Sequence, residues 1–333
     1  MLKIGVIGYG YWGPNVVRNF HLQPDSTVAM VCDQATSKLE RVKRIYPEIH
    51  TTTSSSEVIE SPEIDAIAVV TPVWTHHELG KRVLQQGKHL FIEKPFTCSV
   101  EQADDLIELA EKRNLVIMVD HTFLYTGAVR RIRQFIDDGT LGKLYYYDST
   151  RVNLGLFQHD INVLWDLAPH DLSIMDYLID AKAEGISATG QKHLNGHEDI
   201  AYMTVYFPNK IIAHISVNWL SPVKVRTTLI GGENRMLVWN DLEADEKIKV
   251  YDKGVKIQSS ENVYDLLVSY RSGDMWAPQV DRVEALEAEA GHFVDCVMNS
   301  KRPANDGQAG RRVVQMLQAA SRSVQCRGEA VAL

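Results

Sequence analysis

Two hydrophobic periods divide the chain. Over roughly the first 120 residues, short apolar runs alternate with stretches whose apolar positions recur at helical spacing. The runs read KIGVIG, TVAMVC, IDAIAVV, HLFI and LVIMV, and continuous apolar character of this kind is typical of parallel strands buried on both faces. Strands that alternate with helices predict a doubly wound parallel sheet in an α/β domain.

Two helices of this region carry recognisable end signals. Ser99 with Gln102 three residues later matches a capping box, so we expect a helix that begins at Ser99. A second helix is expected from about His76 to Gln86, because Gly87 suits the left-handed conformation that often ends helices.

The pattern changes after about Asp120. Several β-rich segments follow, separated by short turns such as those at 208–210 and 231–234, and they predict a mostly antiparallel sheet. Two helical patterns, roughly Arg282–Asn299 and Asp306–Arg322, end the chain. The sequence therefore predicts two domains, an α/β domain over residues 1–122 and an α+β domain with C-terminal helices over residues 123–333.

A glycine pattern directly follows the first predicted strand. Gly8, Gly10 and Gly13 form G-x-G-x-x-G, in which the first glycine allows a tight turn, the second a close approach to a pyrophosphate, and the third close packing of helix on strand. Exposed N–H groups and the dipole at the start of the next helix attract phosphate, and Pro14 suits its first turn. This spacing predicts a Rossmann domain that binds a dinucleotide.

Asp33 ends the second predicted strand, where an acid is expected in such domains. Its carboxylate could accept hydrogen bonds from the adenosine ribose, and it would repel a 2′-phosphate. No Arg or Lys follows within the next four residues, so NAD is favoured over NADP. The alternative is a glycine-rich turn with a solvated aspartate.

Lys94 lies between Glu93 and Pro95 at the carboxyl end of the fifth predicted strand. Ligands of open α/β sheets bind at that edge, so Lys94 could hold a substrate hydroxyl or share in proton transfer. Pro95 could adopt a cis bond that aims the lysine. The alternative is a lysine in a surface loop.

Composition limits the remaining classes. With 333 residues the chain can bury a large core, and its net charge of −8 argues against broad nucleic-acid binding. The four cysteines are dispersed without a CxxC pair, which argues against a disulfide framework or a zinc site and favours the cytoplasm. No cluster has metal-ligand spacing, so no metal is expected. We find neither a signal-peptide pattern nor an apolar run that could span a membrane.

Asp166 and His170 stand four residues apart in a predicted helix and share one of its faces. The helix should begin no earlier than about Val163, which puts Pro169 in or near the first turn. His170 would then lie near the positive end of the helix dipole, which favours a neutral imidazole. The alternative is a histidine bonded to a nearby carbonyl on an amphipathic helix. Asp171 and Asp176 are interpreted mainly as helix-start and solvated acids.

Several of these motifs together resemble the glucose–fructose oxidoreductase / inositol dehydrogenase / MocA (Gfo/Idh/MocA) family. They are the three glycines, TPVWTH (71–76), GKHLFIEKP (87–95), DLAPHDLSIMDYL (166–178) and the C-terminal stretch that begins HFVDCV (292–297). The resemblance covers nearly the whole chain. It implies a nicotinamide-dependent oxidoreductase of sugars or cyclitols, in which a Rossmann domain precedes an open-faced antiparallel sheet. That sheet often forms the oligomer interface in the family, so a homodimer or homotetramer is expected.

The resemblance also implies site residues. Lys94 matches the catalytic lysine, His170 the proton-transfer histidine and Asp166 its acidic companion. The positions expected to contact the cofactor are Gly8, Gly10, Tyr11, Trp12, Gly13, Asp33, Thr71, Pro72, His76, Glu93 and Lys94. The chain departs from the commonest family pattern at 119–125, where many relatives have Asn near Thr122, and at LAPH (167–170).

The family's substrate-lining segment corresponds to residues 151–171. The positions expected to contact substrate are Lys94, His121, Phe123, Arg151, Asn153, Gln158, Asn162, Asp166 and His170. Arg151 could meet a phosphate, while the amides could read hydroxyls; the alternative is a strand-capping arginine and loop amides.

The substrate class remains open between several interpretations. The chain resembles members that oxidise carbon 3 of a nucleotide sugar such as UDP-N-acetylglucosamine in cell-surface or lipid A sugar pathways. The alternatives are an inositol or free-sugar dehydrogenase, a ketosugar reductase, and a non-catalytic regulator that binds NAD.

Overall fold

The computed structural model describes residues 1–155, 160–257 and 268–333, which form two compact units. The first unit comprises Met1–Tyr125 and Val283–Gln315, and the second comprises Thr126–Arg282 and Met316–Leu333. Each unit is built on one sheet. No helix among these described residues is long and apolar enough to cross a membrane.

The sheet of the first unit has six strands in the order β3-β2-β1-β4-β5-β6, and every pair is parallel. This confirms the predicted doubly wound sheet. The order reverses between β1 and β4, which is where such sheets open a crevice for ligands. The strands are β1 (Leu2–Ile7), β2 (Ser26–Cys32), β3 (His50–Thr52), β4 (Ala66–Val69), β5 (His89–Glu93) and β6 (Ile117–Asp120).

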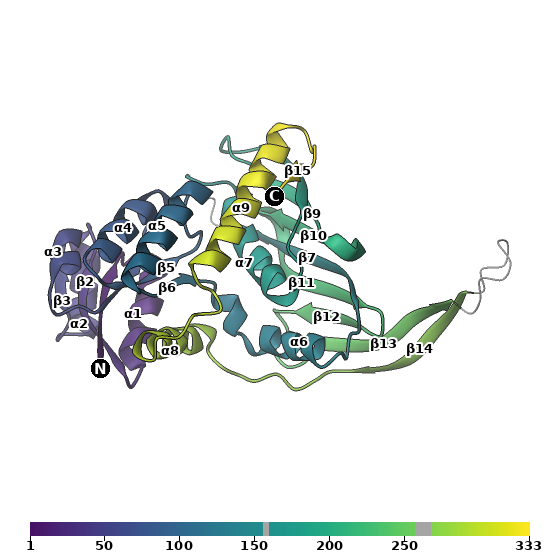
Figure 1. Cartoon of the computed structure of the whole chain (residues 1–333), viewed down its shortest axis with the longest axis horizontal. Helices are drawn as coiled ribbons and strands as arrows, with labels where there is room; N and C mark the ends of the chain where they lie inside the picture. Colours follow the sequence, from purple (N-terminus) through teal and green to yellow (C-terminus); the bar gives the residue numbers. More distant parts are fainter. Residues whose placement is uncertain (156–159, 258–267) are drawn as a thin grey trace. The chain divides into compact units, whose positions relative to one another are not determined.

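Helices join these strands, and the predicted end signals are present (Figure 1). Gly87 has a φ of +74° just after α4, and the Ser99 hydroxyl accepts a hydrogen bond from the backbone N–H of Gln102 at the start of α5. The helical segments are α1 (Gly13–Leu22), α2 (Thr36–Ile45), α3 (Ser55–Glu60), η1 (Val73–Thr75), α4 (His76–Gln85), α5 (Val100–Arg113), η2 (Thr122–Tyr125) and α8 (Ala285–Met298).

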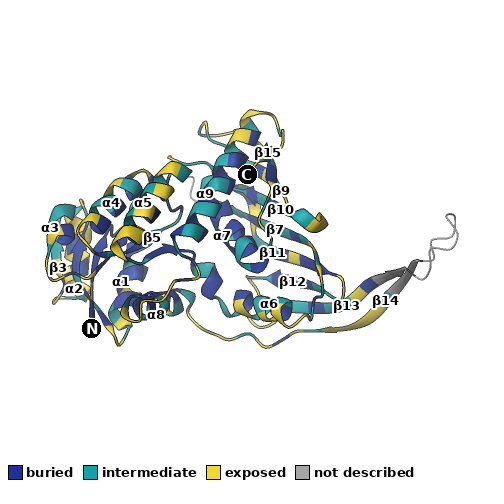
Figure 2. Cartoon of the chain, viewed as in Figure 1, coloured by how far each residue is buried: buried dark blue, intermediate teal, exposed yellow. Residues whose placement is uncertain are grey.

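Helix α8 completes the core of the first unit, although it comes from the last sixth of the chain. Phe293 packs edge-on against Phe20 of α1 and Phe91 of β5, with ring centroids 5.7 Å apart in both pairs. All three rings are buried, and the strands around them are dark blue in Figure 2. Burial of one such ring stabilises the fold by about 1.5–3 kcal/mol. The sequence-based boundary at residue 122 leaves this segment outside the first unit, because periodicity does not show which core a helix covers.

The sheet of the second unit has nine strands in the order β14-β13-β12-β11-β7-β10-β9-β8-β15. Among the strands that the structure describes, only the β10–β7 pair is parallel, so the sheet is mostly antiparallel, as predicted. The strands are β7 (Leu144–Leu154), β8 (Gly185–Gln191), β9 (Ile200–Tyr206), β10 (Ile212–Asn218), β11 (Leu220–Gly232), β12 (Met236–Asn240), β13 (Ile248–Ile257), β14 (Val268–Trp276) and β15 (Val331–Ala332).

The two faces of this sheet differ. Along β9, Ala201, Met203 and Val205 are buried, whereas Tyr202 and Tyr206 are exposed. Helix α7 (Val163–Leu178) packs on β7, β9 and β10 and covers the buried face. The alternation leaves the other face open.

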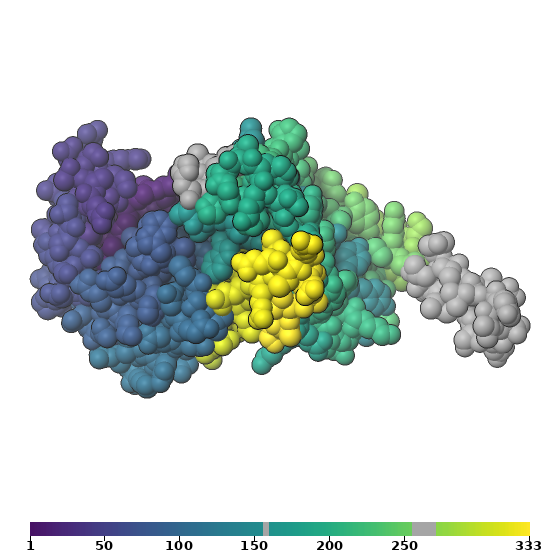
Figure 3. All heavy atoms as spheres, turned by 90° about the horizontal axis from the view of Figure 1, so that it is seen from above, coloured from purple at the N-terminus to yellow at the C-terminus, as the bar shows by residue number. Residues whose placement is uncertain are grey.

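The remaining helices of this unit are α6 (Gly127–Asp137) and the end of α9 (Gly307–Gln325), with a short η3 (Pro208–Lys210) between β9 and β10. The C-terminal residues, yellow in Figure 3, lie against teal segments of the same unit. There the Ser323 hydroxyl accepts a hydrogen bond of 2.8 Å from the N–H of Ala188, and β15 pairs with β8.

Candidate dinucleotide and catalytic site

The three glycines form a cradle after β1. A Cβ atom on Gly8, whose φ is +104°, would lie 2.2 Å from the carbonyl oxygen of Val70, and one on Gly13 would lie 2.4 Å from that of Gly8. A Cβ on Gly10 would meet no atom within 4 Å. Two glycines are thus required for packing, and the third keeps an open face on the loop. Open backbone at a helix start is what a pyrophosphate needs, so the residues present fit a dinucleotide.

Asp33 follows β2 and is tied to the same loop. Its Oδ2 accepts hydrogen bonds from the N–H of Tyr9 at 2.8 Å and from Nζ of Lys38 at 3.1 Å, and its Oδ1 accepts one from the N–H of Ala35 at 2.9 Å. Partial burial alone would raise the pKa of Asp33, but these donors outweigh it and lower the pKa, so the carboxyl is ionised. Lys38 lies just beyond the four residues after Asp33 that contain no Lys or Arg. Its ammonium offsets part of the charge that would repel a 2′-phosphate.

Thr71, Pro72 and His76 lie after β4. The fully buried His76 has Nδ1 2.9 Å from the carbonyl oxygen of Pro95 and Nε2 2.7 Å from that of Thr71. Burial lowers the pKa of His76. The ring therefore connects the loop after β4 to the loop after β5. These contacts give His76 a role in holding the two loops in position.

Lys94 directly follows β5, and its peptide bond to Pro95 is cis. Glu93 pairs in register with Asp120 of β6. Because the strands are parallel, the residues that follow β1, β2, β4, β5 and β6 all lie at one edge of the sheet. That edge therefore gathers the glycine loop, Asp33, Thr71, Lys94 and His121.

Buried and half-buried polar groups form a cluster at this edge, and the contacts among them were not predicted from the sequence, although Trp12 and His121 were expected site residues. The indole Nε1 of Trp12 donates a hydrogen bond of 2.7 Å to Oδ2 of Asp120, and the Thr122 hydroxyl donates to Oδ1. His121 is buried, and desolvation lowers its pKa to about 4, against the opposing charge of Asp120. The available signal in the sequence for this cluster was Asp120, which ends the otherwise apolar strand β6. The indole donor on the glycine loop could not be paired with it, because the two lie 108 residues apart.

Asp166 and His170 lie on α7 in the second unit. The indole Nε1 of Trp219 donates a hydrogen bond of 3.1 Å to Oδ2 of Asp166. The helix begins at Val163, as expected, but Pro169 is inside it, and His170 is its eighth residue. Dipole effects fade beyond the first turn, so the expected influence of the helix dipole on His170 was wrong.

Arg151 and Asp171 form a buried ion pair between β7 and α7. Nε of Arg151 lies 2.6 Å from Oδ2 of Asp171, and the two side chains are 5% and 3% exposed. The Ser149 hydroxyl adds a hydrogen bond of 2.6 Å to the same carboxylate. The interpretation of Asp171 as a solvated acid was therefore wrong: it compensates a buried guanidinium. This pairing favours a structural role for Arg151 over a phosphate contact.

The other expected substrate residues have mixed placements. Asn162 caps α7, because its Oδ1 accepts from the N–H of Trp165 and its Nδ2 donates to Glu198 at 2.8 Å. Asn153 lies near the end of β7, and Phe123 is half-buried in η2. Gln158 lies outside the described residues. Tyr11 on the glycine loop is exposed.

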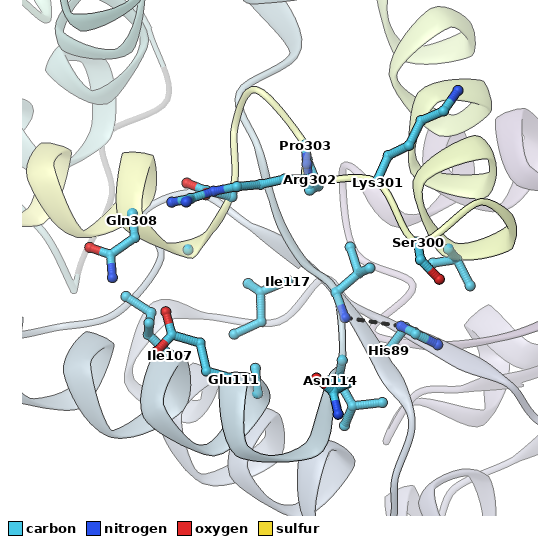
Figure 4. A pocket seen from close by; sticks show the side chains of 16 residues that line it. His89, Ile107, Glu111, Asn114, Ile117, Ser300, Lys301, Arg302, Pro303 and Gln308 are labelled. Atoms are coloured by element: carbon cyan, nitrogen blue, oxygen red, sulfur yellow. Dashed lines mark hydrogen bonds and ion pairs between the residues drawn. The ribbon is translucent and has the colours of Figure 1, made fainter.

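A separate hollow lies at the opposite edge of the first sheet (Figure 4). It has a volume of about 560 Å³, and its lining includes His89, Asn114, Ile117 and Lys301. His89 begins β5 and Ile117 begins β6, so this hollow adjoins the amino ends of the strands. Ligands of doubly wound sheets bind at the carboxyl ends, and none of the predicted site residues lines it.

A parallel sheet with a glycine cradle, an acid after the second strand and a lysine after the fifth defines a dinucleotide-dependent oxidoreductase. The chain belongs to the Gfo/Idh/MocA family: residues 2–121 match the model described as "Oxidoreductase family, NAD-binding Rossmann fold", and residues 129–238 match the family's C-terminal domain. It is therefore an enzyme that uses NAD.

Several characterised proteins are similar over most of their length. UDP-N-acetylglucosamine 3-dehydrogenase from Acidithiobacillus ferrooxidans is 27% identical over 94% of both chains, and its structure has a TM-score of 0.82 over 98% of both. The NAD(+)-dependent scyllo-inositol 2-dehydrogenase of Bacillus subtilis is 26% identical over 91% of this chain and 86% of its own. The structure of GenD2 from gentamicin A biosynthesis in complex with NAD has a TM-score of 0.83 at 18% identity, over 100% of this chain and 96% of its own, which shows a shared fold.

Proposed function

We propose that the enzyme oxidises a secondary hydroxyl, at carbon 3, of a nucleotide-activated sugar such as UDP-N-acetylglucosamine, in cell-surface polysaccharide or lipid A sugar biosynthesis. The observation that carries this proposal is the likeness to the UDP-N-acetylglucosamine 3-dehydrogenase, which extends over 94% of both chains and is matched by the fold. The presence of Lys94 in one unit and of Asp166 and His170 in the other supports it, because alcohol oxidation needs a proton acceptor.

In the proposed reaction each catalytic residue has one task. His170 accepts the proton of the sugar hydroxyl, and Asp166, oriented by Trp219, stabilises the imidazolium that forms. Lys94 hydrogen-bonds the same substrate oxygen and assists the proton transfer. Bound NAD would supply the hydride acceptor for the carbinol carbon. The glycine loop and Asp33 would hold the cofactor through its phosphates and ribose.

Substrate recognition is assigned to polar and aromatic residues of both units. We propose His121, Phe123 and Asn153 as contacts. Asn162 and Arg151 are weaker candidates, because each already has a partner within its own unit.

A cyclitol or free sugar is the second candidate substrate, because the scyllo-inositol 2-dehydrogenase is nearly as similar as the nucleotide-sugar enzyme. A ketosugar reductase would run the same chemistry in reverse. A non-catalytic NAD-binding regulator would not need Lys94, Asp166 and His170.

A substrate panel tests these alternatives. NADH formation is followed by absorbance with UDP-N-acetylglucosamine, other nucleotide sugars, free sugars and inositols. We expect turnover with the nucleotide sugar, and turnover restricted to an inositol would refute the proposed substrate.

Replacement of the catalytic lysine tests its role. Lys94→Ala should abolish turnover while NAD still binds, because the lysine acts on the substrate oxygen. Lys81→Ala, at a surface ion pair with Asp105 on α4 and α5, is the matched control and should retain turnover. Unchanged turnover in Lys94→Ala would reject the assignment.

We also propose a homodimer or homotetramer formed through the open face of the second sheet. Tyr206 and Ile212 are cross-strand neighbours on that face, and Leu229 lies on the same face two strands away, so all three are exposed together. An exposed apolar and aromatic face of this kind is typical of an interface. Sedimentation analysis of the full chain gives the subunit number.

A further inference from the structure

Two carboxyl groups from distant parts of the sequence meet inside the first unit. Asp120 ends β6 and is 2% exposed, and Glu289 lies on α8 and is fully buried. The side chain of Glu289 lies within hydrogen-bonding reach of Asp120. Two ionised carboxylates in such contact are strongly unfavourable, because burial and like charge act in the same direction.

The hydrogen bonds show which group carries the single charge. Both oxygens of Asp120 already accept strong hydrogen bonds, one from the indole of Trp12 and one from the hydroxyl of Thr122. An acceptor with two donors is stabilised as a carboxylate.

Glu289 has the opposite environment. Its Oε1 accepts a hydrogen bond of 2.7 Å from Nδ2 of Asn305, while its Oε2 makes no hydrogen bond within the described part of the chain. The Thr122 hydroxyl also lies close to Glu289, but it donates its proton to Asp120. Asn305 cannot be flipped, because its Oδ1 accepts from the Tyr125 hydroxyl and its Nδ2 also donates to the carbonyl of Val119. Oε1 must therefore be an acceptor, which leaves Oε2 for a proton.

The nearby charges agree with this assignment. The carboxylates of Asp120 and Glu93 lie around Glu289. Helix α1 packs against α8, and its Arg18 is paired with Glu284. Burial, followed by the charge of Asp120, raises the pKa of Glu289 well above its ordinary value. His121 lies close to both Asp120 and Lys94.

We propose that Glu289 is a neutral acid that donates its proton to Asp120, and that this carboxyl pair is a positioning device that holds Trp12, and with it the glycine loop, for the dinucleotide. The proton has a second effect. Phosphates of a dinucleotide bring negative charge to the loop that carries Trp12, so removing one of two nearby negative charges reduces repulsion. Glu289 and Asp120 touch neither the reacting atoms nor the phosphates in this assignment.

The pH dependence of stability tests the proton. The folded chain keeps a proton that an unfolded glutamate releases above about pH 4.3, so the stability contributed by Glu289 falls as pH rises from there to its folded pKa. Glu289→Gln keeps the shape and an N–H donor without this loss. We therefore expect the Tm of the variant minus that of the wild type to increase as the pH rises from about 5 to about 8. A Tm difference that stays constant or decreases over this pH range overturns the proposal, because Glu289 would then have an ordinary or lowered pKa.

Binding of NAD to the purified enzyme, measured by calorimetry, tests the positioning role. Glu289→Ala removes the proposed donor to Asp120 and one of the acceptors of Asn305, and we expect its Kd for NAD to rise about tenfold, the equivalent of one lost hydrogen bond. Glu289→Gln should restore most of this affinity, since its amide can donate to Asp120. Equal weakening by both variants overturns the donor role. If Glu289→Ala does not fold, the affinity of Glu289→Gln decides alone, and a tenfold loss overturns the proposal.

Trp12→Phe tests the connection to the loop, because it keeps an aromatic ring and removes only the N–H donor. We expect a similar rise in Kd, and no further rise when Glu289→Ala is added, since both changes break one connected path. Additive losses would show that the pair and Trp12 act separately.

Discussion

The buried ion pair of Arg151 and Asp171 allows a decisive substitution. Arg151→Met keeps roughly the length of the side chain and removes its charge. The buried carboxylate of Asp171 then loses its counter-charge and keeps the hydrogen bond from the Ser149 hydroxyl. The pair lies between β7 and α7, the helix that carries Asp166 and His170. The substitution therefore tests whether Arg151 is a structural residue or a phosphate contact.

The expected loss follows from the exposure of the pair. Both side chains are almost fully buried, and removing one partner of such a pair costs about 3–5 kcal/mol. In a unit of roughly 150–250 residues, each kcal/mol lowers Tm by about 2–4 °C, so Arg151→Met should lower Tm by roughly 6–20 °C. The double variant Arg151→Met with Asp171→Leu should recover most of this loss, because it leaves no buried charge.

Thermal unfolding and steady-state kinetics with a nucleotide sugar provide the assay. Arg226→Met is the matched control, because Arg226 pairs with Asp241 on the same sheet with its side chain about one-third exposed, and it should cost no more than about 1 kcal/mol. Our reasoning fails if Arg151→Met keeps the wild-type Tm while the KM for the nucleotide sugar rises. That result would make Arg151 a substrate contact.

Two further predictions follow from the first unit. Gly10→Ala should fold normally and lose NAD affinity, whereas Gly8→Ala should also lower Tm, because its Cβ would lie 2.2 Å from the carbonyl of Val70; an equal Tm for the two variants would contradict the cradle. His121 is neutral in the fold, with a pKa of about 4, so the free energy of unfolding should fall by about 3 kcal/mol as pH drops from about 6.5 to about 4. Urea unfolding across this range should show the loss in the wild type and a smaller one in His121→Gln, and identical slopes would mean that another group is responsible.

Local signals predicted the architecture well. Continuous apolar runs, the glycine spacing and the cap at Ser99 each depend on neighbouring residues, and each describes an element that the structure contains. The position of Lys94 also followed, because the end of a parallel strand has a defined place in the sheet.

Contacts between distant residues escaped prediction. Asp171 resembled a solvated acid because nothing near it in the sequence indicates that Arg151, on a strand 20 residues away, needs a counter-charge. The sequence did not single out Glu289 for the same reason, since its neighbours Asp120 and Asn305 belong to other elements. Pro169 was expected in or near the first turn because proline disfavours a helix interior, but α7 accommodates it there.

The return of α8 to the first unit has a consequence for synthesis of the protein. The strands β1–β6 leave the ribosome before β7–β14, yet one wall of their core, with Phe293 and Leu286, is made only after β7–β14. Until then Phe20 and Phe91 lack part of their packing, and a nascent chain in that condition exposes apolar surface to aggregation. A gene truncated before residue 283 would therefore encode a nucleotide-binding half with an open core, even though every strand and glycine of its cradle is present.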